Sequence, residues 1–129
     1  MNVKDIKPTK ATNVTPEVIK AWTAAYPSGI SVLEVESGEL ESVTNDEGKT
    51  EKVPVIKYRG WVRKPNRDEM RELTAIAKSS DPVTYTERIL DIIWLGGDEE
   101  IIKEDEAFYA IMPEVQKVLD IKAAQLKKL

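Results

Sequence analysis

Residues 55–77 constrain the fold most, because the chain changes there from the period of a strand to the period of a helix. Alternation over Val55–Arg63 predicts a strand with one apolar face, made by Ile56, Tyr58 and Val62. The opposite face carries three cationic side chains and one indole: Lys57, Arg59, Arg63 and Trp61. Pro65 has no amide hydrogen with which to continue a ladder, so it ends the strand. The fold must therefore combine a one-sided sheet with at least one helix.

A helix is predicted to begin at Arg67. Asn66 precedes it, and its side chain can accept a hydrogen bond from the amide of Glu69, as an N-cap does. Acidic side chains at positions 68 and 69 suit the positive end of a helix. The apolar spacing predicts a buried stripe of Met70, Leu73 and Ala77, with Ile76 at its margin.

A second alternating stretch, Ile30–Ser37, is predicted to pair with Val55–Arg63 in an antiparallel hairpin. If paired residue numbers sum to 93, opposite charges and apolar faces coincide. The pairs are Glu34 with Arg59, Glu36 with Lys57, Val35 with Tyr58 and Glu41 with Lys52. This register centres the connection within the turn-forming sequence Asn45–Gly48. Residues 39–51 are too polar to be buried and Pro54 interrupts the ladder, so the distal half is predicted to project or to be disordered.

The N-terminal part is predicted to contain an arm and one helix. Residues 1–14 are polar and show neither period, which is typical of a flexible arm that a partner can order. Thr15 followed by Pro16 predicts a helix start, since proline at the first helical position loses no hydrogen bond. The sequence Pro27–Gly29 ends this helix about three turns later.

Asp81 followed by Pro82 predicts another helix start of the same kind. This helix is predicted to run to about Leu95 and to be ended by the glycine pair at 96 and 97. Its second half is apolar on nearly all sides, which is typical of a helix enclosed by its neighbours.

The remaining chain is predicted to be an acidic connector and a long helix. Residues 98–106 form the connector, which tucks Ile101 and Ile102 under the core. The last helix is predicted to start near Asp105 and to keep helical spacing to the end of the sequence. Pro113 is predicted to kink this helix or to split it at the preceding residue, Met112.

These elements predict an α+β fold: an N-terminal helix and an antiparallel β-hairpin followed by a C-terminal bundle of three to four helices. We interpret residues 1–129 as a single domain, in which 1–14 form the arm, 15–64 the helix plus hairpin, and 66–129 the helical part. The composition agrees with one ordinary globular domain, because 41% of the residues are hydrophobic and 33% are charged.

The residue types that are missing narrow the possible functions. The sequence has no cysteine and no histidine, which excludes disulfides and thiolate chemistry and removes the commonest general base and metal ligand. We therefore predict no catalytic residue, no cofactor, no metal and no small-molecule substrate. A net charge of -4 gives no global field for nucleic acid or an anionic membrane. With neither a membrane-spanning run nor a signal peptide, a cytoplasmic protein is expected.

Trp61 is the strongest candidate for a functional residue. Alternation places its large ring on the polar face between Arg59 and Arg63, a composition typical of a protein-binding hot spot. Gly60 leaves an alternative open, in which a bulge turns the ring inward. The basic run around Trp61 can also be interpreted as a nucleic-acid site. Acidic residues nearby in the sequence and in the predicted pairing cancel much of that charge.

Three further patterns are better explained by structure than by chemistry. The acidic stretch 98–106 lacks the alternating ligands and central glycine of a calcium loop. Ser79, Ser80 and Asp81 have no histidine to complete a nucleophilic site, so they are interpreted as a helix cap. The glycine pair at 96 and 97 is not interpreted as a phosphate loop, because it is predicted to follow a helix instead of a strand.

Three segments together resemble a known group of proteins: WVRKPNRDEM, DIIWLGGDEEI and FYAIMPEVQKVLDIKAAQLKKL. From Trp61 to the C-terminus they are similar to small tailed-phage and prophage proteins of the tail-assembly-chaperone type. The resemblance implies a small acidic protein without a cofactor that coats a tape-measure protein while the tail tube polymerises. It implies no catalytic residues. A small nucleic-acid-binding accessory protein of a phage or mobile element is the alternative.

Overall fold

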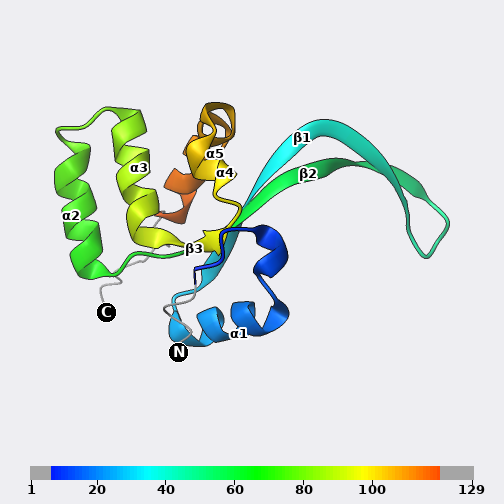
Figure 1. Cartoon of the computed structure of the whole chain (residues 1–129), viewed down its shortest axis with the longest axis horizontal. Coiled ribbons are helices and arrows are strands. Elements are labelled where there is room, and N and C mark those ends of the chain that lie inside the picture. The colour runs from blue at the N-terminus through cyan, green and yellow to red at the C-terminus, as the bar shows by residue number, and fades with distance from the viewer. Residues whose placement is uncertain (1–6, 120–129) are drawn as a thin grey trace, which may run out of the picture.

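The computed structural model describes residues 7–119. Its elements are a 3-10 helix η2 (Ala11–Asn13), α1 (Pro16–Ala25), β1 (Ile30–Thr44), β2 (Thr50–Arg63), α2 (Arg67–Ala77), α3 (Pro82–Ile93), β3 (Trp94–Gly97), α4 (Glu100–Lys103) and α5 (Asp105–Val118). The strands form an antiparallel sheet in the order β1-β2-β3. Helices α2 to α5 gather beside one part of the sheet, whereas the far half of the β1–β2 hairpin extends away from them (Figure 1). The α+β class and the order of helix, hairpin and C-terminal helices are confirmed.

Three helix starts lie where their capping residues predict them. Thr15 accepts a hydrogen bond from the amide of Val18 at the start of α1. Asn66 accepts from the amide of Glu69, and the Glu69 carboxylate accepts in return from the amide of Asn66, which completes a capping box. Asp81 accepts from the amide of Thr84 at the start of α3. Caps lie within three residues of the amides that they bind, so local sequence predicts them well.

The proximal half of the hairpin has the predicted register, with Glu34 opposite Arg59 and Val35 opposite Tyr58. The register then shifts twice. Glu36 lies opposite Ile56 instead of Lys57, and Glu41 lies opposite Val53 instead of Lys52.

The second shift coincides with an irregular stretch of backbone between the two halves. Gly38 has a φ of 87°, a conformation that glycine adopts without strain, and it lies inside the irregular segment between Glu36 and Leu40. Exposed charge pairs contribute only about 0.2–1 kcal/mol each, too little to hold the register across such a segment. Beyond it the strands continue to the predicted turn, where the amide of Gly48 bonds the carbonyl of Asn45. Pro54 lies within β2, opposite Leu40, and does not end the strand.

The third strand, β3, is the main departure from the prediction. Helix α3 ends at Ile93, and Trp94–Gly97 then pairs with β2 instead of continuing the helix. Glycine permits this close approach: a Cβ on Gly97 would lie 2.5 Å from the carbonyl oxygen of Arg59. A Cβ on Gly60 would likewise lie 2.3 Å from the ring of Trp94. Gly60 therefore makes room for Trp94 and does not turn Trp61 toward the core.

One face of the sheet and the C-terminal helices enclose the core. Its buried side chains are Leu33, Val35, Val62, Leu73, Ile89, Leu90, Ile93, Ile101, Ala107, Phe108, Ile111, Val115 and Val118. Two details differ from the predicted faces, since Ala77 is exposed and only one of the two isoleucines in the acidic stretch is covered. Ile101 is fully buried, whereas Ile102 is 38% exposed.

Pro113 does not split the last helix, because α5 runs from Asp105 to Val118 with the proline inside it. The buried side chains of Ile111, Val115 and Val118 lie on both sides of the proline. Their burial, at about 1.5–3 kcal/mol per large aliphatic side chain, offsets the roughly 3 kcal/mol that an internal proline costs a helix. The predicted continuation of this helix to Leu126 lies outside the described residues.

Candidate functional site

Trp61 lies on the face of the central strand that points away from the core. It is opposite Val32 on one side and Gly96 on the other. Directly opposite residues of antiparallel strands share a face, and a Cβ on Gly96 would lie 2.7 Å from Cδ of Pro8. The chain around Pro8 therefore lies on the same face as Trp61. Trp61 is half-buried on this outer face.

Arg63 is held by contacts within the fold. Its guanidinium donates to both carboxylate oxygens of Glu69 at 2.8 Å and to the carbonyl of Ile92 at 2.9 Å. It also lies 5.2 Å from the centre of the Tyr26 ring. The hydrogen bond from Arg63 lowers the pKa of the Glu69 carboxyl, and the same bond raises the pKa of Arg63. This arginine therefore joins β2, α2, α3 and Tyr26, the residue that follows α1.

Arg59 is exposed, but it also has an acidic neighbour. Its Nε donates to Glu34 at 2.9 Å, the cross-strand pair predicted from the register. Arg71 likewise donates to Asp68 at 2.6 Å. The structure thus keeps Arg59, Trp61 and Arg63 on adjacent positions of one face, but each arginine has a carboxylate partner.

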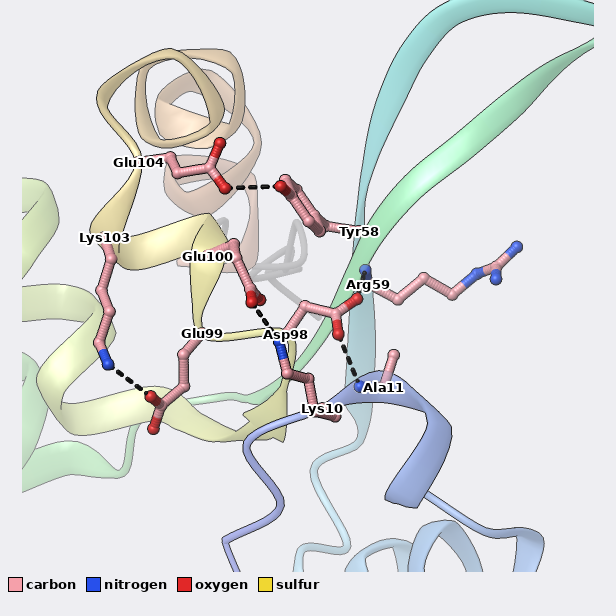
Figure 2. Close-up of polar contacts among 9 residues, drawn as sticks. All are labelled: Lys10, Ala11, Tyr58, Arg59, Asp98, Glu99, Glu100, Lys103 and Glu104. Carbon is pink, nitrogen blue, oxygen red and sulfur yellow. Dashed lines mark hydrogen bonds and ion pairs between the residues drawn. The ribbon is translucent and has the colours of Figure 1, made fainter.

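The acidic stretch holds the N-terminal segment against the sheet (Figure 2). The carboxylate of Asp98 accepts from the amide of Ala11 at 2.8 Å and from the amide of Arg59 at 3.0 Å. The amide of Asp98 donates in turn to the carbonyl of Arg59 at 2.8 Å. Asp98 therefore joins three segments that are far apart in the sequence. The connector predicted for residues 98–106 is therefore also a point of attachment at this residue.

Residues 8–14 are bound to the rest of the chain, so the predicted flexible arm over 1–14 is wrong for this part. The carbonyl of Pro8 accepts from the amide of Gly97 at 2.9 Å, and that of Thr9 accepts from Glu99 at 3.3 Å. Lys10 also forms an ion pair with Glu100, which raises the pKa of the lysine and lowers that of the carboxyl. Residues 1–6 lie outside the described residues. The segment docks because its carbonyls accept hydrogen bonds from the amides of Gly97 and Glu99. Sequence patterns do not reveal that these amides need a partner.

The end of the acidic stretch is tied to β2. The hydroxyl of Tyr58 donates to the carboxylate of Glu104 at 2.5 Å, as Figure 2 shows. This bond to an ionised group raises the pKa of Tyr58 to about 12, with smaller contributions from burial and from nearby carboxylates. Glu99 pairs with Lys103 at 2.8 Å on α4. Most of the charged side chains in the acidic stretch therefore form contacts within the fold.

The remaining sequence patterns have structural roles in the described residues. Asp81 caps α3 and also accepts from the hydroxyl of Thr84 at 2.9 Å. Gly96 and Gly97 end a strand that is followed by a helix, contrary to the prediction, but α4 has only four residues and follows two acidic side chains, Asp98 and Glu99. Within residues 7–119, no three acidic side chains converge as ligands for a metal ion.

None of the described helices packs on the far half of the hairpin (Figure 1). It exposes two aliphatic side chains: Leu40 is 61% exposed and Val43 is 46% exposed. A two-stranded ribbon without a packed face is marginally stable alone, so a partner would stabilise it.

Comparisons with models of protein families, with curated proteins and with solved structures gave no match to this chain. Among the described helices, none has both the length and the apolar character required to span a membrane.

Proposed function

We propose that this protein is a non-enzymatic assembly factor that binds another polypeptide, and that it acts as a tail-assembly chaperone of a phage or prophage in the bacterial cytoplasm. The observation that carries the proposal is the projecting hairpin with its exposed Leu40 and Val43. Exposed aliphatic side chains on an uncovered ribbon are a ready surface for a protein chain. The tape-measure protein as partner follows from the resemblance of the C-terminal half.

The chemistry of the chain supports binding in preference to catalysis. The sequence contains no histidine and no cysteine, and most of the acidic groups between Asp98 and Glu104 are engaged in hydrogen bonds within the fold. A general base must have its proton-accepting atom free to meet a substrate.

The second candidate, a nucleic-acid-binding accessory protein, has the basic run of β2 and α2 in its favour. The carboxylate partners of Arg59, Arg63 and Arg71 weaken it, because each cancels charge that would hold a phosphate. A net charge of -4 also repels nucleic acid at long range.

The test is co-expression with the tape-measure protein encoded in the same genome, whose gene should lie directly downstream. We expect a complex that survives size-exclusion chromatography. Leu40→Ser combined with Val43→Ser should abolish it while the urea midpoint stays unchanged, since both side chains are exposed. The matched control is Val83→Ser, which removes an exposed aliphatic side chain, 38% exposed, from α3.

Three results separate the candidates. No complex with the wild-type protein contradicts the chaperone function. A shifted DNA or RNA band at physiological salt, weakened by Arg59→Ala, favours the second candidate. Trp61→Ser in the same co-expression tests the predicted face: a lost complex with an unchanged urea midpoint supports it, and a lowered midpoint with an intact complex assigns the ring to the fold.

A further inference from the structure

The outer edge of β1 presents backbone groups to solvent, and their directions follow from β2. Both the amide and the carbonyl of Arg59 bond Asp98, so they point toward β3 and away from β1. Directly opposite residues of antiparallel strands either exchange both hydrogen bonds or both turn away. Glu34 is opposite Arg59, so its amide and carbonyl point outward. The amide and carbonyl of Val32, two residues earlier, also point outward, because these backbone groups alternate in direction along a strand.

Both residues are accessible to solvent. Val32 is 45% exposed and Glu34 is exposed as well. Among residues 7–119, no hydrogen bond from outside the sheet reaches the backbone of either residue. An edge strand in this state is a template for an additional strand.

A groove lies along the same edge. Six consecutive residues of β1, from Ser31 to Glu36, line one side of an open hollow of about 780 Å³, and residues of α5 line the other. The α5 wall is formed by Ala110, Glu114, Lys117 and Val118. Six residues of strand span about 20 Å, so a segment of that length can pair along the whole groove. The small side chain of Ala110 leaves room beside the strand.

The charges of β1 indicate which segment fits. This strand contains four glutamates (Glu34, Glu36, Glu39 and Glu41) and neither lysine nor arginine. Arg59 pairs with Glu34, whereas none of the other three forms an ion pair with a described cation. A second copy paired through its own β1 would bring glutamates together, which destabilises a strand pair.

We propose that the β1 edge receives an extended strand of a partner protein in which lysine or arginine alternates with aliphatic residues. The aliphatic side chains would enter the groove beside Leu33, Val35 and Val118, and the cationic ones would lie near the glutamates of β1, of which Glu34 shares the outer face with Arg59. This inference rests on the proposed protein-binding function and adds the chemistry of the partner segment.

The probe is an acetylated, amidated ten-residue peptide of alternating valine and lysine. The matched control peptide alternates valine and glutamate. Binding is measured by fluorescence anisotropy at 150 mM salt, which screens contacts beyond about 8 Å. We expect the lysine peptide to bind at least about tenfold more tightly, the ratio that 1.4 kcal/mol produces. Amide hydrogen exchange of Val32 and Glu34 should be fast in the free protein and slow in the complex.

Charge reversal on the protein tests the same surface. Glu36→Lys combined with Glu41→Lys leaves the backbone ladder in place and should weaken binding of the lysine peptide at least about tenfold. The control, Glu87→Lys, reverses a single charge on the exposed face of α3 and should leave binding of the lysine peptide unchanged.

Four results would overturn the proposal: no binding of the lysine peptide, equal binding of the glutamate peptide, slow exchange at Val32 and Glu34 in the free monomer, or slow exchange only in a concentration-dependent dimer. The third result assigns the edge to another segment of the same chain, and the fourth to a second copy.

If the lysine peptide does not bind but the tape-measure complex still forms, only the proposal about the β1 edge is rejected. Peptide binding without that complex rejects the chaperone function alone.

Discussion

The hydrogen bond from Tyr58 to Glu104 joins the central strand to the start of α5. A group whose pKa is higher in the folded chain stabilises the fold fully below its unfolded pKa, which for tyrosine is about 10. The folded value is about 12, so this stabilisation is lost between pH 10 and 12. We expect Tyr58→Phe to lower the free energy of unfolding at pH 9, with the difference from wild type shrinking over that range. Urea denaturation at each pH measures this.

Tyr109→Phe is the control, because it removes a phenol from the exposed face of α5 without touching Glu104. Its free energy of unfolding should follow that of the wild type at every pH. A difference between Tyr58→Phe and the wild type that stays constant from pH 9 to 12 would show that the hydroxyl hydrogen bond does not set the pKa of Tyr58.

The capping box at the start of α2 is the best test at the level of a secondary-structure element. Asn66→Ala removes the acceptor for the amide of Glu69, at 2.8 Å. We expect the free energy of unfolding to fall by about 1 kcal/mol, the usual cost of losing an N-cap. Circular dichroism during urea denaturation measures this loss.

Asn66→Asp keeps an oxygen that can accept the same hydrogen bond, so it should restore most of the stability. Equal losses in the two variants would mean that the cap is not the source of the effect. An unchanged urea midpoint in Asn66→Ala would contradict the role of Asn66 at this boundary. Glu69 also binds Arg63, which links the position of α2 to β2.

At the scale of the whole molecule, Asp98 joins the N-terminal segment, the central strand and the acidic stretch. Asp98→Ala leaves the amides of Ala11 and Arg59 without their acceptor. We expect a loss of about 1–3 kcal/mol in unfolding free energy, the cost of unsatisfied backbone donors. Amide hydrogen exchange should also become faster at Ala11 and Gly97, because the segment around Pro8 is released from β3.

Glu106→Ala is the matched control, since this exposed carboxylate lies in the same acidic stretch and bonds no described backbone amide. It should change the unfolding free energy by less than about 0.5 kcal/mol. Unchanged stability and unchanged exchange at Ala11 in Asp98→Ala would refute the docking of the N-terminal segment.

Local sequence predicted the features that depend on neighbouring residues. Thr15, Asn66 and Asp81 each cap a helix because the amide that they bind is three residues away. The proximal hairpin register also followed from sequence, since alternating apolar positions must face one core. The position of Trp61 on the outer face followed from the same alternation. The groove between β1 and α5 could not be predicted, because it depends on where α5 crosses the sheet.

The sequence by itself determined the α+β class, the helix starts and the polarity of the two faces of β2, because these follow from contacts within a few residues or from simple periodicity. Tertiary structure decided the third strand, the docking of residues 8–14 and the roles of Asp98 and Arg63. The sequence of Trp94–Gly97 predicts the end of a helix. These residues form a strand instead because Gly97 approaches Gly60 closely enough for β3 to pair with β2. Such pairing is not encoded locally, since the backbone groups that it satisfies belong to residues 32 to 37 positions apart.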